Sequence, residues 1–180
     1  MMDRERLEAL LSELPLYVYM DIDPKGLEFS QRIRYICQAE CPMYDKTWAC
    51  PPAVGDVESC KRKCLSYKKC LMIGTITETE DIADMATALA TRPEHEAITN
   101  QVRSFFREQD IEPYILSTEA CAICERCAWL DGLPCRMPGR MHPCLESHGI
   151  NLIPTLEENG LDFQYGGNII TWYSLLFYNE

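Results

Sequence analysis

The chain has 180 residues, of which 47% are hydrophobic and 25% are charged, so it is long and apolar enough to bury a core of its own. Its 28 acidic residues against 17 Lys and Arg give a formal net charge of -11, which repels nucleic-acid phosphates and anionic membrane surfaces. The sequence contains no run of about 18 apolar residues, and its N-terminal segment lacks the apolar stretch of a secretory signal. We therefore expect a cytoplasmic protein that binds neither nucleic acid nor a membrane.

Hydrophobic spacing predicts alternating helices and strands in a single domain that covers residues 1–180. Leucines at helical spacing predict a helix over residues 4–14, and Pro15 ends it. A second helical pattern covers residues 82–106, and we expect Pro93 to divide it into two helices. Apolar runs predict strands at residues 16–20, 69–77, 111–117 and 169–177. This order favours an α/β or α+β fold in which helices flank a small sheet.

Cysteine is the outlier in the composition, with 11 residues at positions 37, 41, 50, 60, 64, 70, 121, 124, 127, 135 and 144. In a reducing cytoplasm, a dense cysteine pattern serves metal binding or catalysis more often than disulfides. The number is odd, and a chain of this length needs no covalent cross-links to stabilise its core. We therefore expect metal ligands rather than a disulfide scaffold.

The densest cysteine pattern is Cys121, Cys124, Cys127 and Cys135. The first three lie three residues apart, so a tightly coiled loop directs their sulfurs toward one centre, as in ferredoxin-type runs that bind iron–sulfur clusters. Structural zinc more often uses two Cys-x2-Cys pairs separated by a longer stretch. The spacing favours a [4Fe-4S] cluster, with zinc as the alternative. Arg136 follows the last cysteine, and we expect it to pair with an acid rather than donate to a cluster sulfur.

Earlier in the chain lies a first group of thiols, Cys37, Cys41 and Cys50, in a proline-rich stretch without sustained periodicity; the four cysteines from Cys121 to Cys135 are the second group. The pattern predicts an irregular loop that a metal holds in place of regular secondary structure. Pro51 follows Cys50 directly and keeps it in extended geometry, as in the Cys-Pro ending of ferredoxin runs. Trp48 stands between the thiols, where it could cover a cluster or pack in the core.

The two groups contain three and four thiols, which do not divide into two complete sets of four. In one arrangement the second group holds its own cluster, and Cys60, Cys64 or Cys70 supplies the fourth ligand of the first group. In the other arrangement the groups cross, because in two-cluster ferredoxins the cysteine before proline ligates the other cluster. Cys50 would then join the first three cysteines of the second group. Spacing alone leaves both arrangements open.

The sequence gives weaker evidence that the remaining cysteines bind metal. Cys60, Cys64 and Cys70 lie within residues 59–70, a stretch with five Lys and Arg residues. These cations would lower the thiol pKa values and suit the docking of an acidic partner, whereas a solvated basic face with a buried Cys70 is the alternative.

Cys144 has His142 and His148 near it, but no third group that would orient a nucleophile or complete a metal site. We expect surface or capping roles for these histidines, and a short helix over residues 143–148 that Gly149 ends.

The segments CPMYDKTWACPP and CAICERCAWLDGLPCRMPGRMHPCLESHGINL resemble an uncharacterised cysteine-rich family described as predicted metal-binding proteins, a domain of unknown function common in anaerobic bacteria and archaea. The family has no established reaction, so the resemblance implies metal binding by the seven thiols and no particular chemistry. In the family pattern a small hydroxyl residue is usual in place of Cys144, and a glycine in place of Asp45. The matching positions are Cys37, Cys41, Tyr44, Trp48, Cys50, Pro51, Pro52, Cys121, Cys124, Cys127, Cys135, Arg136, Pro138, Glu146 and Gly149.

Together, these observations predict a cytoplasmic iron–sulfur protein with two ligand loops, at about residues 37–52 and 121–144. It would hold one or two [4Fe-4S] clusters and pass electrons to a partner enzyme. A zinc-stabilised interaction module is the first alternative, and an iron–sulfur enzyme with one open iron is the second. The expected ligands are Cys37, Cys41, Cys50, Cys121, Cys124, Cys127 and Cys135.

Overall fold

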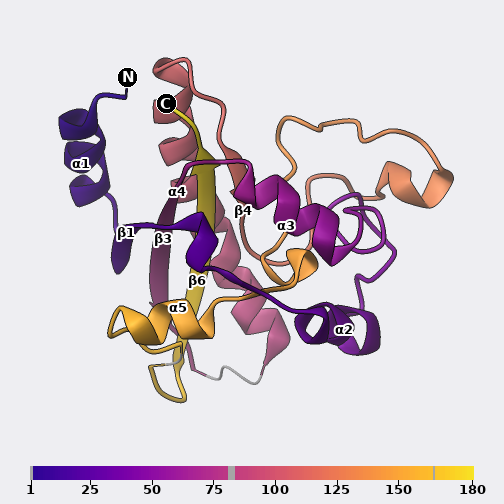
Figure 1. Cartoon of the computed structure of the whole chain (residues 1–180). Helices are drawn as coiled ribbons and strands as arrows, with labels where there is room; N and C mark the ends of the chain where they lie inside the picture. Colours follow the sequence, from indigo (N-terminus) through magenta and orange to yellow (C-terminus); the bar gives the residue numbers. More distant parts are fainter. Residues whose placement is uncertain (1, 81–83, 164) are drawn as a thin grey trace.

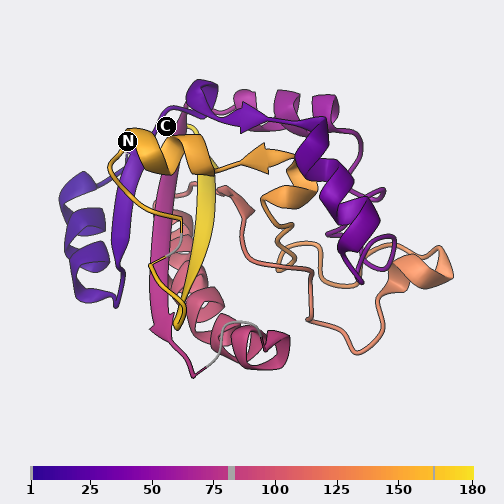
Figure 2. The ribbon, with the colours of Figure 1, turned by 90° about the horizontal axis from the view of Figure 1, so that it is seen from below.

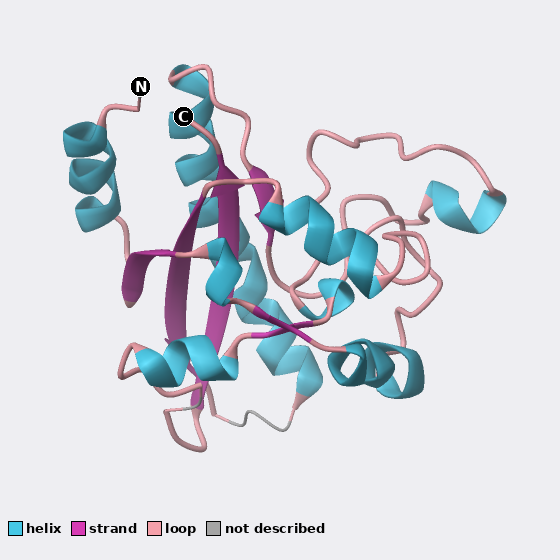
Figure 3. Ribbon diagram, in the orientation of Figure 1, coloured by secondary structure: helices cyan, strands magenta, loops and turns pink. Residues whose placement is uncertain are grey.

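The computed structural model describes residues 2–80, 84–163 and 165–180. Within these residues an antiparallel sheet has the strand order β1-β3-β6-β4, and two short strands, β2 and β5, pair separately (Figures 1 and 3). The strands are β1 (Val18–Ile22), β2 (Glu28–Phe29), β3 (Lys69–Glu78), β4 (Tyr114–Leu116), β5 (Ile150–Asn151) and β6 (Ile169–Tyr178). The α-helices are α1 (Arg4–Glu13), α2 (Gln31–Glu40), α3 (Val57–Leu65), α4 (Met85–Glu108) and α5 (Ile153–Glu158).

Strands β3 and β6 form the centre of the sheet and pair along their whole length, from Lys69 opposite Tyr178 to Glu78 opposite Ile169. Both strands read as nearly continuous apolar runs because helices cover both faces of the sheet. All strand pairs of the described residues are antiparallel, so the fold is α+β, the second of the two classes that the sequence allowed.

Each face of the sheet has its own apolar core. Successive side chains of a strand point to opposite faces, so Leu71 and Ile73 of β3 pack with α1 and α4 on one face. Cys70 and Met72 of the same strand pack on the other face, with α5 and the C-terminal end of α3. Figure 2 shows α4 and α5 on opposite sides of the sheet, with α1 beside its β1 edge.

The part of the chain that carries most of the cysteines lies beyond the β4 edge of the sheet. Helices α2 and α3 and the long irregular segment between β4 and β5 gather there (Figures 1 and 2). Neither apolar core includes a residue of the described segments 38–56 or 117–144. Packing of apolar side chains therefore holds the sheet more strongly than it holds the cysteine segments. No helix in the described ranges is both long enough and apolar enough to span a membrane.

Most of the predicted elements are confirmed. The first helix, the strands that became β3, β4 and β6, and the Gly149 helix end are present, although the last helix is a 3₁₀ turn, η3 (Glu146–His148). Gly149 has φ +72, a left-handed conformation that glycine adopts without strain. The first strand begins at Val18, two residues later than predicted.

Two local predictions are wrong. Helix α4 runs through Pro93 without a break, because contacts on both sides of the proline hold it against the sheet. Arg92 donates a hydrogen bond to Thr118, and His95 is buried against β3 and β6. Tertiary contacts here outweigh the cost of one proline inside a helix. Cys37 lies on a helix, α2, rather than in an irregular loop. Ile82, where the helical pattern of α4 begins, lies outside the described residues.

Candidate metal centre

The first group of thiols begins on α2. This helix starts after Ser30, whose hydroxyl accepts a hydrogen bond from the Arg32 amide, and it places Cys37 in its last turn. Cys41 follows four residues later, at the helix C-cap, so both thiols lie on the same side of the helix end. Cys37 is buried, and Cys41 is partly exposed.

A set of tight turns then brings Cys50 back toward the end of α2. The Asp45 amide donates to the Pro51 carbonyl at 2.8 Å, and the Cys50 amide donates to the Thr47 carbonyl at 3.1 Å. Asp45 has φ +57, in the left-handed region, which explains why glycine suits this position in the family pattern. Cys50 is 4% exposed.

The second group of thiols lies in the irregular segment after β4. Cys124 lies in a bend, Cys121 and Cys127 lie in irregular backbone on either side of it, and the 3₁₀ turn η2 (Ala128–Asp131) leads toward Cys135. These four cysteines line one small cavity. The cavity wall is completed by Trp48, Ile123, Ala128, Arg136, Met137 and Met141. The second group of thiols therefore borders one largely apolar space.

Two tryptophans join the cysteine segments, and we call this pair the tryptophan clasp. The rings of Trp48 and Trp129 meet edge to face, with their centroids 4.8 Å apart. Trp48 Nε1 donates to the Leu133 carbonyl at 2.9 Å, and Trp129 Nε1 donates to Asp45 Oδ1 at 2.8 Å. Each ring thus bonds the segment that carries the other ring, which fixes the two thiol groups side by side.

Cys50 lies at the junction of the two groups. Burial raises the pKa of its thiol, and the neighbouring thiols of Cys41, Cys121 and Cys127 raise it further. Burial also raises the pKa of Cys37 to about 11, with Glu146 and Cys41 as additional causes. Thiolates in such a group repel one another, and a bound cation removes that repulsion.

The thiol groups fit a soft metal or an iron–sulfur cluster by donor type. Thiolate sulfur is the ligand that zinc and iron–sulfur centres prefer, and the described residues that line the cavity include no carboxylate that would bind a hard cation. Within the described ranges, no three Cys, His, Asp or Glu side chains converge closely enough to form a finished coordination site. The cysteines share a cavity wall, and ligation would require small movements of the irregular segments.

Comparison with known proteins gives one family. Residues 20–178 match the family described as "Predicted metal-binding protein (DUF2284)". The chain belongs to this family. The match includes all eleven cysteines, and the metal-binding description agrees with a thiol-lined cavity. No curated protein and no solved structure matches the chain.

Four cysteines of this DUF2284 chain belong to neither of the two thiol groups. Cys64 and Cys70 are fully buried in the apolar core of the sheet, where burial raises the pKa of Cys64 to about 12. Cys60 is also buried, and its thiol contacts the Val54 carbonyl and the Arg34 guanidinium. The prediction of a buried Cys70 is confirmed, and none of these three thiols lines the cavity of the second group.

Cys144 is buried beside the metal-binding segments. Its sulfur accepts a hydrogen bond from the Ser147 amide at 3.3 Å, and burial raises the pKa of its thiol well above the usual value. A small hydroxyl residue, which is usual at this position in the family pattern, could accept the same hydrogen bond from the Ser147 amide.

The prediction of a surface role for His148 is wrong. Its side chain is 1% exposed, its Nε2 lies in hydrogen-bond contact with the Tyr114 hydroxyl, and its Nδ1 contacts the Ser147 hydroxyl at 3.0 Å. Burial lowers the pKa of His148 to about 3, so the neutral imidazole forms part of the packing. No carboxylate partner is found for Arg136 among the described residues; it lines the thiol cavity and donates to the Arg126 carbonyl.

Sequence reasoning missed several residues that shape this region. Trp129, Met137 and Met141 were not assigned a role, although Trp129 stands two residues after Cys127 just as Trp48 stands two before Cys50. That symmetry is visible in the sequence. The partners of the two indole N–H groups are not visible, because each lies in the other segment.

Proposed function

We propose that this chain is a cytoplasmic iron–sulfur protein that binds at least one [4Fe-4S] cluster and passes single electrons to a partner protein. The observation that carries the proposal is the shared cavity of Cys121, Cys124, Cys127 and Cys135, with three of the thiols at three-residue spacing. The matched family supports metal binding, and the identity of the metal is our inference from the thiol spacing.

The cavity wall supports a redox centre. Trp48, Met137 and Met141 would restrict water beside the sulfurs, and Arg136 would contribute a positive charge next to them. Solvent access and hydrogen bonds to sulfur set the reduction potential of such clusters. When bound, a cluster of this class accepts and returns one electron, and the chain supplies its ligands, its shielding and its access route.

Cys50 supports a crossed arrangement of ligands. It precedes a proline and adjoins the thiols of Cys121 and Cys127, whereas Cys60, Cys64 and Cys70 pack elsewhere. We propose that Cys50 is the fourth ligand of a cluster that Cys121, Cys124 and Cys127 also bind. Alternatively, Cys50 and Cys135 alternate as this fourth ligand.

The position of the second segment suits electron transfer to another protein. Residues 122–126 and 130–140 are almost all exposed, and Leu130 and Leu133 project apolar side chains into solvent there. Electron transfer between proteins requires the centre to lie near the surface, and an exposed segment with a few apolar side chains suits a small, transient interface.

The proposal is tested by anaerobic purification, followed by a visible spectrum and by iron, sulfide and zinc analysis of the same sample. We expect a broad brown absorbance with about four or eight irons per chain and matching sulfide. Colourless protein that contains only zinc, and that still binds only zinc after anaerobic reconstitution with iron and sulfide, would contradict the proposal.

A further inference from the structure

A second cavity lies beside the thiol cavity, between α4 and the segment that runs from Cys121 to His142. Its volume is about 780 Å³, within the usual range for small-molecule sites. Cys121, Ala122 and Ile123 form one wall, so the cavity adjoins the segment that carries the second group of thiols. We call it the arginine cavity, after the side chains on its opposite wall.

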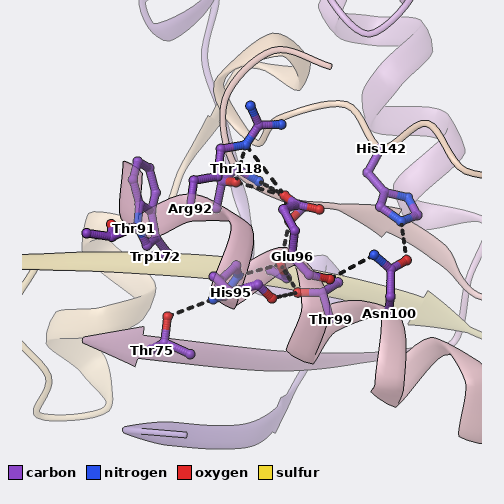
Figure 4. Close-up of polar contacts among 12 residues, drawn as sticks. Thr75, Thr91, Arg92, His95, Glu96, Thr99, Asn100, Thr118, His142 and Trp172 are labelled. Atoms are coloured by element: carbon purple, nitrogen blue, oxygen red, sulfur yellow. Dashed lines mark hydrogen bonds and ion pairs between the residues drawn. The ribbon is translucent and has the colours of Figure 1, made fainter. Parts of the chain in front are cut away.

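Polar residues of α4 form that opposite wall. They follow one another at spacings of three or four residues, which aligns them on one side of the helix. Figure 4 shows Arg92, Glu96 and Asn100 projecting from α4 toward Thr118 and His142 of the long segment. The α4 residues of the wall include Arg92, Glu96, Asn100, Arg103 and Arg107.

The carboxylates near the arginine cavity are fully engaged. Glu96 accepts hydrogen bonds from the Ser117 hydroxyl at 2.7 Å and the Thr118 hydroxyl at 2.8 Å, and it lies 3.9 Å from the Arg92 guanidinium. Glu112 is shared by two guanidinium groups, those of Arg103 and Arg107. The acids of this region are therefore already neutralised.

The arginines outnumber these acids. Arg140 also lines the cavity, and no carboxylate within the described part of the chain pairs with it. Four arginines thus line a cavity whose neighbourhood supplies two carboxylates, Glu96 and Glu112. This excess of positive charge is local, because the whole chain has a formal net charge of -11.

Buried contacts fix part of the α4 wall of the arginine cavity in place. Arg103 is only 7% exposed, and its guanidinium also donates to the Gly139 carbonyl, which links α4 to the long segment. One turn of α4 is fixed by a buried polar network in which His95 contacts Thr75 and Ser174 at 2.8 Å each. A guanidinium group held in place, as that of Arg103 is, loses little entropy when it binds an anion.

We propose that the arginine cavity binds a small organic molecule through a carboxylate or phosphate group. Guanidinium groups bind both anions by paired, charge-assisted hydrogen bonds. A concave site in an acidic chain excludes a polyanion such as nucleic acid and admits a small anion. The inference goes beyond electron transfer, because it places a ligand next to Cys121, and it does not depend on which metal the thiols bind.

The arginine excess has one other explanation, which is that it offsets the negative charge of a thiolate-bound metal centre. The two explanations differ in their consequences. Removing an arginine from an anion site weakens the binding of an added anion and leaves the metal in place. Removing an arginine that only offsets the charge of the centre changes metal content or the visible spectrum and does not affect an added anion.

The test is calorimetric titration of the protein, purified anaerobically with its metal, at low ionic strength. The two probes are inorganic phosphate and succinate, which separate phosphate from carboxylate recognition. The variants are Arg140→Gln and Arg107→Gln, and Arg32→Gln on α2, an exposed residue that does not line the cavity, is the charge-matched control. Iron, sulfide and zinc are measured for every variant.

We expect saturable binding of at least one probe, weakened about tenfold or more by each cavity variant, which corresponds to one lost charge-assisted hydrogen bond. Binding by Arg32→Gln should match that of the unchanged protein, and metal content should be equal in all four proteins. The proposal is wrong if neither probe binds saturably, if the cavity variants bind as tightly as the control, or if they lose metal while anion binding is unaffected. A colourless zinc protein that binds the probe as expected would refute electron transfer and leave the anion site standing.

Discussion

Individual cysteines of this chain differ in what surrounds them, although all eleven are free thiols. Cys124 lines the thiol cavity and is partly exposed, whereas Cys144 is buried and already accepts a hydrogen bond from the Ser147 amide. A thiol that serves the metal and a thiol that serves the packing should respond differently to the same substitution.

Replacement of Cys124 by alanine tests the ligand assignment. We expect Cys124→Ala to lose most of its bound metal, because ligation at such a site needs every thiolate, and to lose stability together with the metal. Cys144→Ala should keep its full metal content and lose about 1 kcal/mol of stability, because the Ser147 amide loses its acceptor. Metal analysis and urea unfolding of both variants show which of the two thiols binds the metal and which one only packs. Full metal in Cys124→Ala with an empty centre in Cys144→Ala would overturn the assignment.

His95 gives the chain a dependence of stability on pH. Burial lowers the pKa of His95 from 6.5 to about 4. The unfolded chain therefore binds more protons than the folded chain between these two pH values. The free energy of unfolding is greatest above about pH 6.5 and falls as the pH drops toward 4, by on the order of 2–3 kcal/mol for this residue. His148 acts in the same direction, since burial lowers its pKa to about 3.

The histidine contribution is measured with His95→Gln, which keeps a polar side chain and does not titrate. Urea unfolding at several pH values between 4 and 7 should show a shallower loss of stability in the variant, and part of the loss remains because burial also lowers the pKa values of His148 and His142. Any loss caused by protonation of metal-binding thiolates is common to both proteins. Identical slopes in the two proteins would show that folding does not lower the pKa of His95.

At the scale of elements, the tryptophan clasp is the contact that holds the two cysteine segments together. Trp48→Phe and Trp129→Phe keep an aromatic ring and remove the indole donors to Leu133 and Asp45. We expect each variant to lose about 1 kcal/mol of stability and to release its metal to a chelator several times faster, because the segments separate more readily.

Trp172→Phe is the matched control for the clasp. Its indole N–H donates to the Thr91 hydroxyl at 2.7 Å, so the substitution removes one comparable hydrogen bond between β6 and α4. Its stability should fall by a similar amount, while the rate of metal release stays unchanged. Equal release rates in all three variants would show that the clasp has no specific effect on the centre.

Much of the sheet follows from the sequence, because its strands carry their own pattern. Residues 69–77 and 169–177 are apolar and β-branched enough to predict β3 and β6, and helices on both faces explain the continuous runs. Local patterns are less informative where contacts with residues far away in the sequence determine the local structure. Pro93 predicted a helix break that burial of its neighbour His95 prevents, and Cys37 lies on a helix capped by Ser30.

The metal region was predictable as a set of residues and not as an arrangement. Cysteine spacing predicted that Cys121, Cys124, Cys127 and Cys135 belong together, and they line one cavity. The proximity of Cys50 to that group depends on contacts across more than 80 residues of chain, such as the bond from Trp48 to Leu133. The arginine cavity was missed for the same reason, since Arg140 joins the α4 arginines only after the long segment folds back.

At the scale of the molecule, the chain consists of two parts with different sources of stability. The sheet and its helices are held by apolar cores on both faces. The described cysteine segments contribute no residue between 117 and 144 to either core. Hydrogen bonds hold them instead, including those of the clasp, those from Ser117 and Thr118 to Glu96, and that from Arg103 to the Gly139 carbonyl. Segments with so little apolar burial open easily unless another interaction holds them in place, and we expect metal ligation to be that interaction.

Removal of the metal should therefore loosen one part of the chain and leave the other folded. We expect amide hydrogen exchange in residues 41–56 and 119–142 to accelerate by about a hundredfold or more after chelation, because these segments then open locally. The amides of β3 and β6 should remain protected, since their pairing and both apolar cores do not involve the metal. Hydrogen exchange followed by mass spectrometry, on the metal-containing and the chelated protein, measures both regions in one experiment. Unchanged exchange in the cysteine segments would show that they do not depend on metal, and loss of protection throughout β3 and β6 would show that the two parts unfold as one unit.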